Sequence, residues 1–459
     1  MAKLALRLAF FAVGMNFVIP RLADGYQMYI SSASVVYLCL PAVLLGSASF
    51  WAVRSFARSW PVILCIAVAW FGLCYGGVRT NHRGHLNVAY LTMLLPMAAL
   101  IVEQRCWWLC ARMYVLGCVA GLALALWFEY VVHFSGIAGA FYRFGNLLNA
   151  AGTFKLANPN LLGDQFALAA VLAFMLYLQG DTANRPNRST AAATGRFGLG
   201  WMLFLSLGCV LTASRGAFLA WLGGISVLLL GGMRGQKSER LQGLAALCSV
   251  LIFAVVFSVA ATGFRPWQTL QMRMESPAAV LSASGRVPIW IAALEVWLSN
   301  PRNFLLGLGT GLAPESLGAH MGYFLADGLS PFPTDCHNTF VEWGLSFGLV
   351  GMISGACLLW QTFDKARRLD RRDGTANRLA VLACISLASM AYVTVFQTFF
   401  LAAGPLILAM LSEPSGHAGR AEKHKGVSDD RNTRSPHFLG QDRRIAGEHS
   451  RPGLRAEPA

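Results

Sequence analysis

Apolar runs of about 17–25 residues recur along this chain, and each is long enough to cross a bilayer as a helix. Only 13% of the residues are charged, against roughly 25% in an average soluble domain. Lipid cannot hydrogen-bond bare backbone groups, so spanning segments form helices or a closed barrel. The runs lack the period-two alternation of barrel strands. We therefore expect an all-α polytopic membrane protein rather than a large soluble helical protein.

The spacing of these runs predicts about twelve transmembrane helices. They cover residues 4–20, 35–53, 60–78, 86–102, 108–132, 164–180, 197–213, 216–232, 242–262, 339–360, 378–394 and 396–411. The first contains Arg7 and resembles a signal peptide, but no small-residue cleavage pattern follows it, so we interpret it as an uncleaved span. The predicted organisation has four parts: nine helices in 1–262, a large polar loop in 263–338, three helices in 339–411 and a disordered tail in 412–459.

The net charge of +15 orients the predicted spans and does not indicate a nucleic-acid partner. Lys and Arg concentrate in the segments 233–241 and 362–377 and at other span ends of the same side, which the positive-inside rule assigns to the cytoplasm. Both termini then lie inside, and the loop 263–338 lies outside. Basic residues on the outer side oppose this bias and therefore need a functional explanation.

Within the large loop, residues 287–299 are expected to form a helix, because Ile289, Trp290, Ala293, Leu294 and Trp297 recur at three- and four-residue spacing. Asn300-Pro301 ends this helix. We expect it to lie at the membrane surface with its tryptophans at headgroup level. The glycine-rich run at 307–311 lacks the strand–turn–helix context of a nucleotide site, so we expect a tight turn that returns the chain to the membrane.

Two outer arginines are candidates for phosphate binding. Arg215 sits in the tight turn Thr212-Ala213-Ser214-Arg215-Gly216 between two spans. A charge at membrane depth costs about 2.5–3.5 kcal/mol on insertion scales and marks a functional site by default, with snorkelling to the interface as the alternative. Arg286 follows Gly285 at the start of the predicted loop helix, where backbone N–H groups favour an anion. Its planar guanidinium matches the geometry of phosphate oxygens. The alternative interpretation is that Arg286 is an ordinary exposed arginine of the loop.

His337 is the candidate for proton transfer. It precedes a predicted span and lies between Asp335 and Asn338. Imidazole titrates near neutrality, which suits a general base, although a histidine at a helix entrance also occurs as a cap or an interface residue. Asn338 is placed either to bind substrate or to cap the following helix.

Two further polar patches lie on the expected outer side. One contains Arg143, Lys155 and Asn158-Pro159-Asn160, and the other covers 79–85; both patches are equally consistent with plain interface anchors. No Walker motif, useful carboxylate pair or metal-ligand spacing is present in the sequence. We therefore expect no metal and no cofactor.

The order of these motifs resembles the O-antigen ligase and polymerase superfamily of bacterial envelope glycosyltransferases. The matching residues are Leu211-Thr212-Ala213-Ser214-Arg215-Gly216-Ala217, Ser284-Gly285-Arg286 with Trp290, Asn300-Pro301, Leu306-Gly307-Leu308-Gly309-Thr310-Gly311, and His337-Asn338-Thr339-Phe340 followed by Gly348-Leu349-Val350-Gly351. Asn158-Pro159-Asn160 is similar to the family's upstream element. The resemblance covers about 140–360. It implies a glycosyltransferase C-type-like fold in the bacterial inner membrane, with the active site facing the periplasm.

The resemblance also implies an O-antigen ligase, which transfers a glycan from undecaprenyl pyrophosphate to the lipid A core. Arg215 and Arg286 would hold the pyrophosphate, and His337 would activate the acceptor hydroxyl in a one-step inverting displacement without a metal. The substrate-binding residues would be Arg143, Lys155, Asn158, Asn160 and Asn338. The implied partners are the lipid-linked donor, the lipid A core and membrane lipids, with no nucleic acid.

Two alternatives remain open. An O-antigen or exopolysaccharide polymerase, or a protein O-oligosaccharyltransferase, would use the same donor and a different acceptor. One dominant outer loop favours a ligase, since polymerases of the family usually show two, and no large folded C-terminal domain is expected. A lipid or solute transporter would need paired ionisable residues deep within spans or repeated halves, and inspection of the sequence finds neither.

Overall fold

The computed structural model describes residues 2–15, 60–76, 82–127, 159–182, 188–232, 286–324, 328, 331, 334–391 and 398–412. All of these residues belong to one compact unit, Met1–Glu413. The predicted spans at 35–53 and 242–262 and the tail after residue 412 lie outside the described residues.

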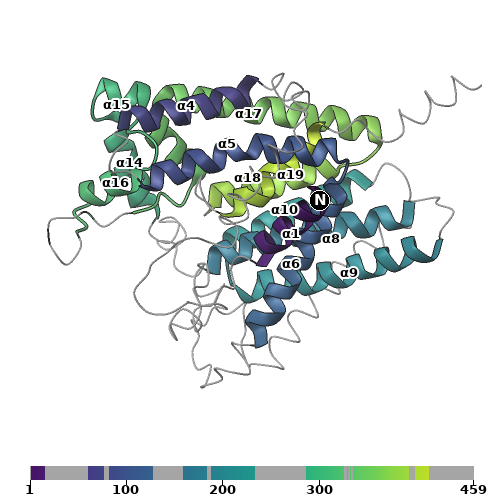
Figure 1. Cartoon of the computed structure of the whole chain (residues 1–459). Helices are drawn as coiled ribbons and strands as arrows, with labels where there is room; N and C mark the ends of the chain where they lie inside the picture. The colour runs from purple at the N-terminus through teal and green to yellow at the C-terminus, as the bar shows by residue number, and fades with distance from the viewer. Residues whose placement is uncertain are drawn as a thin grey trace, which may run out of the picture. The chain divides into compact units, whose positions relative to one another are not determined.

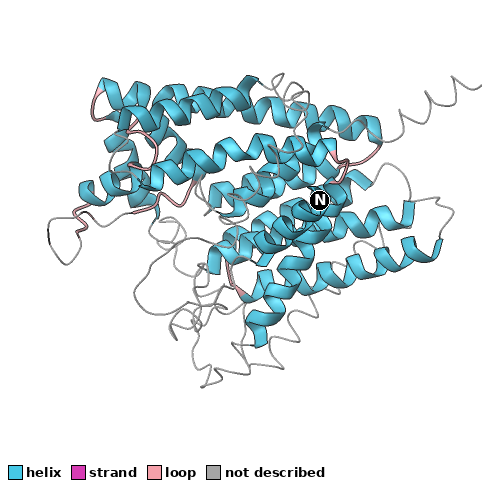
Figure 2. Cartoon of the chain, in the orientation of Figure 1, coloured by secondary structure: helices cyan, strands magenta, loops and turns pink. Residues whose placement is uncertain are grey.

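Across the described ranges the chain forms helices and no strand, with one isolated bridge between Phe324 and Pro331 (Figure 2). The helices that coincide with predicted spans are α1 (Ala2–Met15), α4 (Trp60–Gly76), α5 (His82–Glu103), α6 (Trp107–Trp127), α8 (Pro159–Thr182), α9 (Arg188–Leu211), α10 (Arg215–Gly232), α17 (Thr339–Asp373), α18 (Asn377–Ala391) and α19 (Thr398–Ser412) (Figure 1).

Three stretches of described helix are long and apolar enough to cross a membrane, judged by length and composition: Trp107–Trp127, Asn160–Leu178 and Thr339–Asp373. Further helices carry shorter apolar stretches, such as Trp60–Tyr75 and Arg215–Gly231. The predicted all-α membrane architecture is confirmed. The predicted number of twelve spans is not established by these helices.

Helix α8 lies at the centre of the described packing. It contacts α6, α9, α10 and α18, and large side chains such as Phe166 and Phe174 are buried along it. At its start, a Cβ placed on Gly163 would lie 2.7 Å from both Thr212 Oγ1 and Ala217 Cβ. A glycine therefore lets the first turns of α8 press against the turn between α9 and α10.

The predicted outer loop contributes three short helices, α14 (Arg286–Leu298), α15 (Pro301–Leu306) and α16 (Ala313–His320), which pack on one another and on α17 (Figure 1). Helix α14 confirms the helix predicted at 287–299. Ala293, Leu317, Cys336 and Leu345 belong to the buried core of this group. Burial of apolar surface thus fixes the outer helices to α17.

The tryptophans of α14 are used differently from the sequence expectation. Trp290 Nε1 donates to Cys336 O at 2.9 Å, and Trp297 Nε1 donates to Phe304 O at 3.1 Å. The exposed apolar side chains of α14 are instead Ile291, Leu294 and Leu298. Both indole N–H groups therefore bind backbone carbonyls of the protein, one before α17 and one in α15, and the aliphatic residues form the exposed apolar face.

Helix α17 is broken at Gly348, which has φ 60° and ψ −155°. This left-handed backbone strains any residue with a side chain. A Cβ at this position would also lie 2.5 Å from Leu305 C and 2.6 Å from Gly307 N. Position 348 thus needs glycine for its backbone conformation and because the backbone of Leu305 and Gly307 lies too close to leave room for a side chain. The predicted span at 339–360 is consequently interrupted and not a continuous helix.

The glycine-rich segment 307–311 binds to this break. Leu308 N–H donates to Leu345 O at 3.0 Å, and Gly309 N–H donates to Ser346 O at 2.9 Å. Carbonyls freed by a break need such partners, because hydrocarbon supplies none. Thr310 Oγ1 then donates to Ala69 O of α4 at 2.7 Å. The segment predicted as a tight turn therefore joins α4 to the part of α17 that precedes the break.

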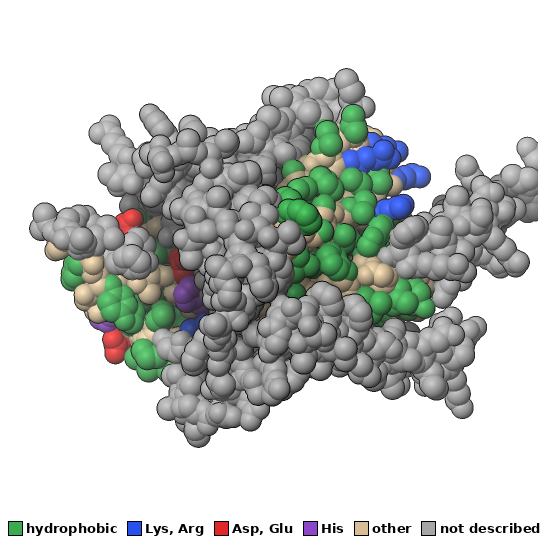
Figure 3. Space-filling model, turned by 90° about the horizontal axis from the view of Figure 1, so that it is seen from below, with side chains coloured by type: hydrophobic (Ala, Val, Ile, Leu, Met, Phe, Trp, Pro, Cys, Tyr) green, Lys and Arg blue, Asp and Glu red, His purple; other side chains and the backbone are tan. Residues whose placement is uncertain are grey.

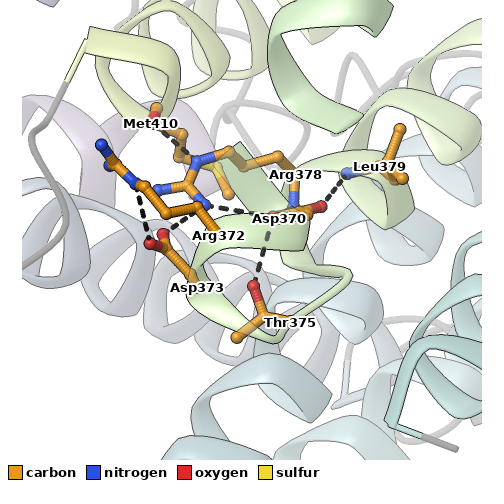
Figure 4. Close-up of polar contacts among 7 residues, drawn as sticks. All are labelled: Asp370, Arg372, Asp373, Thr375, Arg378, Leu379 and Met410. Carbon is orange, nitrogen blue, oxygen red and sulfur yellow. Dashed lines mark hydrogen bonds and ion pairs between the residues drawn. The ribbon is translucent and has the colours of Figure 1, made fainter. Parts of the chain in front are cut away.

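A buried ion-pair network fixes the C-terminal end of α17 (Figure 4). Asp370 is 1% exposed and accepts from Arg378 Nη1 at 3.1 Å and from Leu379 N–H at 2.9 Å. Arg378 Nε also donates to Met410 O at 3.0 Å. The network links α17, α18 and α19, and it satisfies the partners that buried charges require.

The basic segment 362–377 was predicted as a cytoplasmic loop, and the structure corrects this interpretation because α17 continues through it to Asp373. Arg367 and Arg368 both pair with Asp364 at the three- and four-residue spacing of a helix face. Figure 3 shows apolar side chains over much of the visible described surface, and most of the visible Lys and Arg side chains lie toward one end of it.

We expect Gly348→Ala to destabilise the protein strongly. A backbone with φ 60° and ψ −155° is essentially restricted to glycine and costs a residue with a side chain about 1–3 kcal/mol, and the added Cβ would overlap the backbone of Leu305 and Gly307. The melting midpoint of the full-length protein in nanodiscs measures the effect. Gly200 in α9 is the matched control, since a Cβ there would meet nothing within 4 Å. Gly200→Ala should leave the midpoint unchanged or raise it, and equal midpoints for both variants would contradict the break.

Candidate functional site

The three candidate residues Arg215, Arg286 and His337 all lie at helix N-termini. Arg215 and Arg286 are the first residues of α10 and α14, and His337 precedes Asn338, the N-cap of α17. The first turn of a helix presents backbone N–H groups and the positive end of the helix dipole. Each of the three positions therefore combines a basic side chain with a backbone environment that favours an anion.

The turn that carries Arg215 is held tightly between α9 and α10. Thr212 Oγ1 donates to Cys209 O at 2.7 Å, Ala213 has φ 47°, and Ser214 Oγ accepts from Ala217 N–H at 3.4 Å. These contacts end α9 and start α10 within four residues, which confirms the predicted tight turn. Arg215 is half-buried at its end.

His337 is held between the outer helices and the membrane helices. On one side, Trp290 Nε1 of α14 donates to the carbonyl of Cys336. On the other, Asn338 Oδ1 accepts from Phe340 N–H at 2.9 Å, and Asn338 Nδ2 donates to Met390 O of α18 at 3.2 Å. Asn338 therefore caps α17, one of the two roles expected from the sequence.

The backbone of His337 is itself unusual. Its φ is 51°, a left-handed value that is uncommon for residues other than glycine, although histidine adopts it more often than most residues do. Such strain is retained where neighbouring contacts enforce it, and it is enriched at functional sites. Ala213, two residues before Arg215, has φ 47°. Strained backbone thus occurs beside two of the three candidate residues.

The electrostatic surroundings of His337 favour a neutral imidazole. Burial lowers the pKa of His337 below its ordinary value, Asp335 opposes this shift, and the positive charge of Arg286 reinforces it. A neutral imidazole has a lone pair that can accept a proton. Burial also raises the pKa of the neighbouring Cys336 thiol well above its usual range, so this thiol stays protonated.

The predicted substrate-binding residues are described only in part. Asn160 lies in the first turn of α8 and is 8% exposed. Arg143, Lys155 and Asn158 lie outside the described residues, as do the side chains of the patch at 79–85. Their assignment to substrate binding stays a prediction.

Asp164 is a residue of this region that we did not predict from the sequence. It lies in the second turn of α8, inside the apolar stretch Asn160–Leu178, and it is 0% exposed. It interacts electrostatically with Arg286 of α14. The signal that the sequence offered for Asp164 was a single acidic residue within a 19-residue apolar stretch, since ionisable residues in such stretches are functional candidates. Asp164 has no partner within a predicted span, because the cation with which it interacts, Arg286, belongs to the predicted outer loop.

Residues 200–356 match the family model described as O-antigen ligase. This segment includes Arg215, Arg286, His337 and the break at Gly348, and it lies within the region 140–360 where the motif resemblance was recognised. No curated protein matches the chain. The family match confirms the resemblance drawn from the motifs. Residues 200–356, which carry all three candidate residues, are similar to the O-antigen ligase family, and this match supports the O-antigen ligase and polymerase superfamily.

Proposed function

We propose that the protein is an O-antigen ligase that transfers a glycan from undecaprenyl pyrophosphate to the lipid A core, on the periplasmic side of the bacterial inner membrane. The observation that carries the proposal is the position of Arg286. It stands at the positive end of α14, interacts electrostatically with His337, and belongs to the same family segment as Arg215. Cationic groups next to a neutral base suit a reaction with an anionic leaving group and a hydroxyl acceptor.

The proposed reaction is a single displacement. His337 accepts the proton of the acceptor hydroxyl, and the hydroxyl oxygen forms a bond to the anomeric carbon of the donor glycan. The bond from that carbon to the pyrophosphate oxygen breaks on the opposite face, so the anomeric configuration inverts. Undecaprenyl pyrophosphate leaves with the bonding electrons. Arg215 and Arg286 stabilise the charge that develops on it, together with the N–H groups of the α10 and α14 first turns.

A polymerase or an oligosaccharyltransferase of the same superfamily is the second candidate, because it would use the same donor site. The single dominant outer loop in the sequence favours a ligase. Deletion of the gene separates the candidates. Loss of capped lipopolysaccharide with accumulation of full-length lipid-linked polymer indicates a ligase, and a single-repeat cap indicates a polymerase. Unchanged lipopolysaccharide with loss of exopolysaccharide or glycoprotein indicates another acceptor.

Alanine replacement of Arg215, Arg286 or His337 should each lower glycan transfer by at least about 100-fold, the usual effect of losing a charge-stabilising group or a general base. Capped lipopolysaccharide from the complemented deletion strain, separated on a gel, measures the loss. Arg367→Ala is the matched control, since Arg367 is an exposed arginine at the other end of α17. Normal ladders from all three site variants would refute the assignment.

The pH dependence of transfer tests the role of His337. Because burial and Arg286 lower its pKa, the imidazole stays neutral below the ordinary histidine value, about 6.5, and the rate should fall only at more acid pH. The Asp335 carboxylate raises the pKa of His337. Asp335→Asn should therefore move the acid limb of the rate profile to lower pH. Asp364→Asn, at the exposed ion pair of α17, should not move it. A shift of the acid limb to higher pH in Asp335→Asn would contradict a histidine base.

The indole hydrogen bond of Trp290 provides a test of how His337 is positioned. Trp290→Phe and Trp297→Phe each remove one hydrogen bond to a carbonyl, at Cys336 and Phe304 respectively. Each variant should lose about 1 kcal/mol of stability, measured by the melting midpoint. Transfer should fall in Trp290→Phe alone, because only its acceptor carbonyl adjoins His337. Equal transfer rates in the two variants would show that this anchor does not position the base.

A further inference from the structure

Arg302 of α15 is a basic residue of the predicted outer loop that the proposed reaction does not use. Basic residues on this side oppose the charge bias of the chain, so Arg302 needs an explanation of its own. The side chain is exposed, and its guanidinium carbon lies 4.2 Å from the ring centroid of Tyr75, in the last turn of α4. Among the residues that the structure describes, Arg302 makes no ion pair.

The ring of Tyr75 holds the guanidinium and leaves its hydrogen-bond donors available. A cation over an aromatic face is attracted by the electron density of the ring. This attraction uses none of the five N–H donors of an arginine, and those donors match the oxygens of a phosphate group. Arg302 therefore presents a positioned positive charge to which no described carboxylate is paired.

An apolar groove lies one helical turn away from Arg302 and Tyr75. It has a volume of about 230 Å³, and its lining residues come from α4, α15 and α17: Ala67, Val68, Phe71, Leu306, Phe347 and Val350. Phe71 precedes Tyr75 by four residues and stacks on it with 5.9 Å between the ring centroids. Leu306 follows Arg302 by four residues in α15. Because helix residues four apart share a face, the groove continues directly from the aromatic ring and the cation.

The groove is open along the surface of the helices. Phe71 and Val350 at its edges are 54% and 43% exposed, whereas Phe347 at its base is 1% exposed. Beside the groove α4 packs closely on α17, since a Cβ on Gly72 would lie 3.0 Å from the Phe347 ring. The volume is smaller than the roughly 300–1,000 Å³ of pockets that enclose a small ligand. An open, wholly apolar groove of this size suits a segment of hydrocarbon chain.

We propose that this groove and Arg302 form a binding site for one anionic phospholipid of the leaflet next to the outer helices. One acyl chain lies between α4 and α17, and the phosphate of the headgroup accepts hydrogen bonds from the Arg302 guanidinium. Charge complementarity identifies this occupant, because a neutral lipid would fill the groove and leave the cation without an anion. The site shares no residue with the proposed donor site, and it does not depend on the proposed transfer reaction.

Native mass spectrometry of the full-length protein in detergent micelles tests the headgroup contact. The probes are phosphatidylglycerol and diacylglycerol with the same acyl chains, of which only the first carries a phosphate. Arg302→Gln should raise the Kd for phosphatidylglycerol about five-fold, the usual effect of one basic residue near an anionic lipid. The Kd for diacylglycerol should stay unchanged. Arg302→Glu reverses the charge and should raise the Kd for phosphatidylglycerol further.

The matched control for the headgroup contact is Arg367→Gln, which removes an exposed arginine at the other end of α17. It should leave the Kd for both lipids unchanged. An unchanged Kd for phosphatidylglycerol in Arg302→Gln would overturn the inference. So would an equal rise for phosphatidylglycerol and diacylglycerol, because Arg302 would then support only the packing of α15 and not bind a headgroup.

A larger side chain at the edge of the groove tests the acyl-chain contact. Ala67 lines the groove and is exposed, so Ala67→Phe fills the groove without entering the core. The Kd for phosphatidylglycerol and the Kd for diacylglycerol should rise together. Ala123→Phe, at an exposed alanine of α6 outside the groove, should change neither. Val350→Phe makes the same test if Ala67→Phe is not recovered folded, and unchanged Kd values in the folded groove variant would overturn the inference.

The polyprenyl chain of the proposed donor is the competing occupant of the groove. Undecaprenol, which has this chain without phosphates, separates the two. We expect an excess of undecaprenol to leave phosphatidylglycerol bound, and Ala67→Phe to leave the Kd for undecaprenol unchanged. Displacement of phosphatidylglycerol by undecaprenol, together with weaker undecaprenol binding in Ala67→Phe, would assign the groove to the donor chain and overturn the inference.

Discussion

The interruption of α17 at Gly348 is the constraint on which the outer part of the structure depends. A helix that stops within an apolar segment exposes carbonyls that lipid cannot satisfy. The carbonyls of Leu345 and Ser346 accept hydrogen bonds from the backbone N–H groups of Leu308 and Gly309. The loop is therefore hydrogen-bonded to the helix at the point where the hydrogen bonds of the helix itself are interrupted. The outer helices are thereby part of the membrane fold and do not form a separate domain.

This attachment has a direct consequence for the site. Helix α14 packs through Ala293 on the same core as Leu345 of α17, and Trp290 binds the carbonyl of Cys336. Arg286 at the start of α14 is therefore held at a fixed position relative to the start of α17. The packing of α14 on α17, next to the loop contacts that close the break, thus brings a cation from a distant part of the sequence within electrostatic range of His337.

Several features of this arrangement were predictable because they depend on neighbouring residues. The turn at 212–216, the helix at 287–299 and the capping role of Asn338 follow from local propensity and hydrogen bonding, and all three are present. The helical continuation of α17 through 362–373 was also local, but its charged residues were interpreted as a loop. Asp364 paired with Arg368 one turn later was the pattern that indicates a helix.

Other features depend on contacts between distant residues, and sequence periodicity carries no information about them. The run from Gly344 to Gly355 is uniformly apolar or small, so nothing in it separates a broken helix from a continuous one until Leu308 and Gly309 are known to bind there. The spacing of Trp290 and Trp297 predicted a helix correctly, yet it could not decide whether their indoles face lipid or carbonyls. Asp164 was missed for the same reason, because Arg286 approaches it from another part of the fold.

The backbone conformation of His337 also depends on long-range contacts. A left-handed backbone at a histidine is unfavourable by itself, and it persists because the residues on both sides are fixed independently. Cys336 is held by α14 on one side, whereas Asn338 is held by α17 and α18 on the other. The orientation of His337 is therefore determined by the relative position of these two groups of helices. Any movement of α14 away from α17 would displace Arg286 and relax His337 together, so the arginine that we propose to bind the leaving group and the histidine that we propose as the base are coupled through a single packing interface.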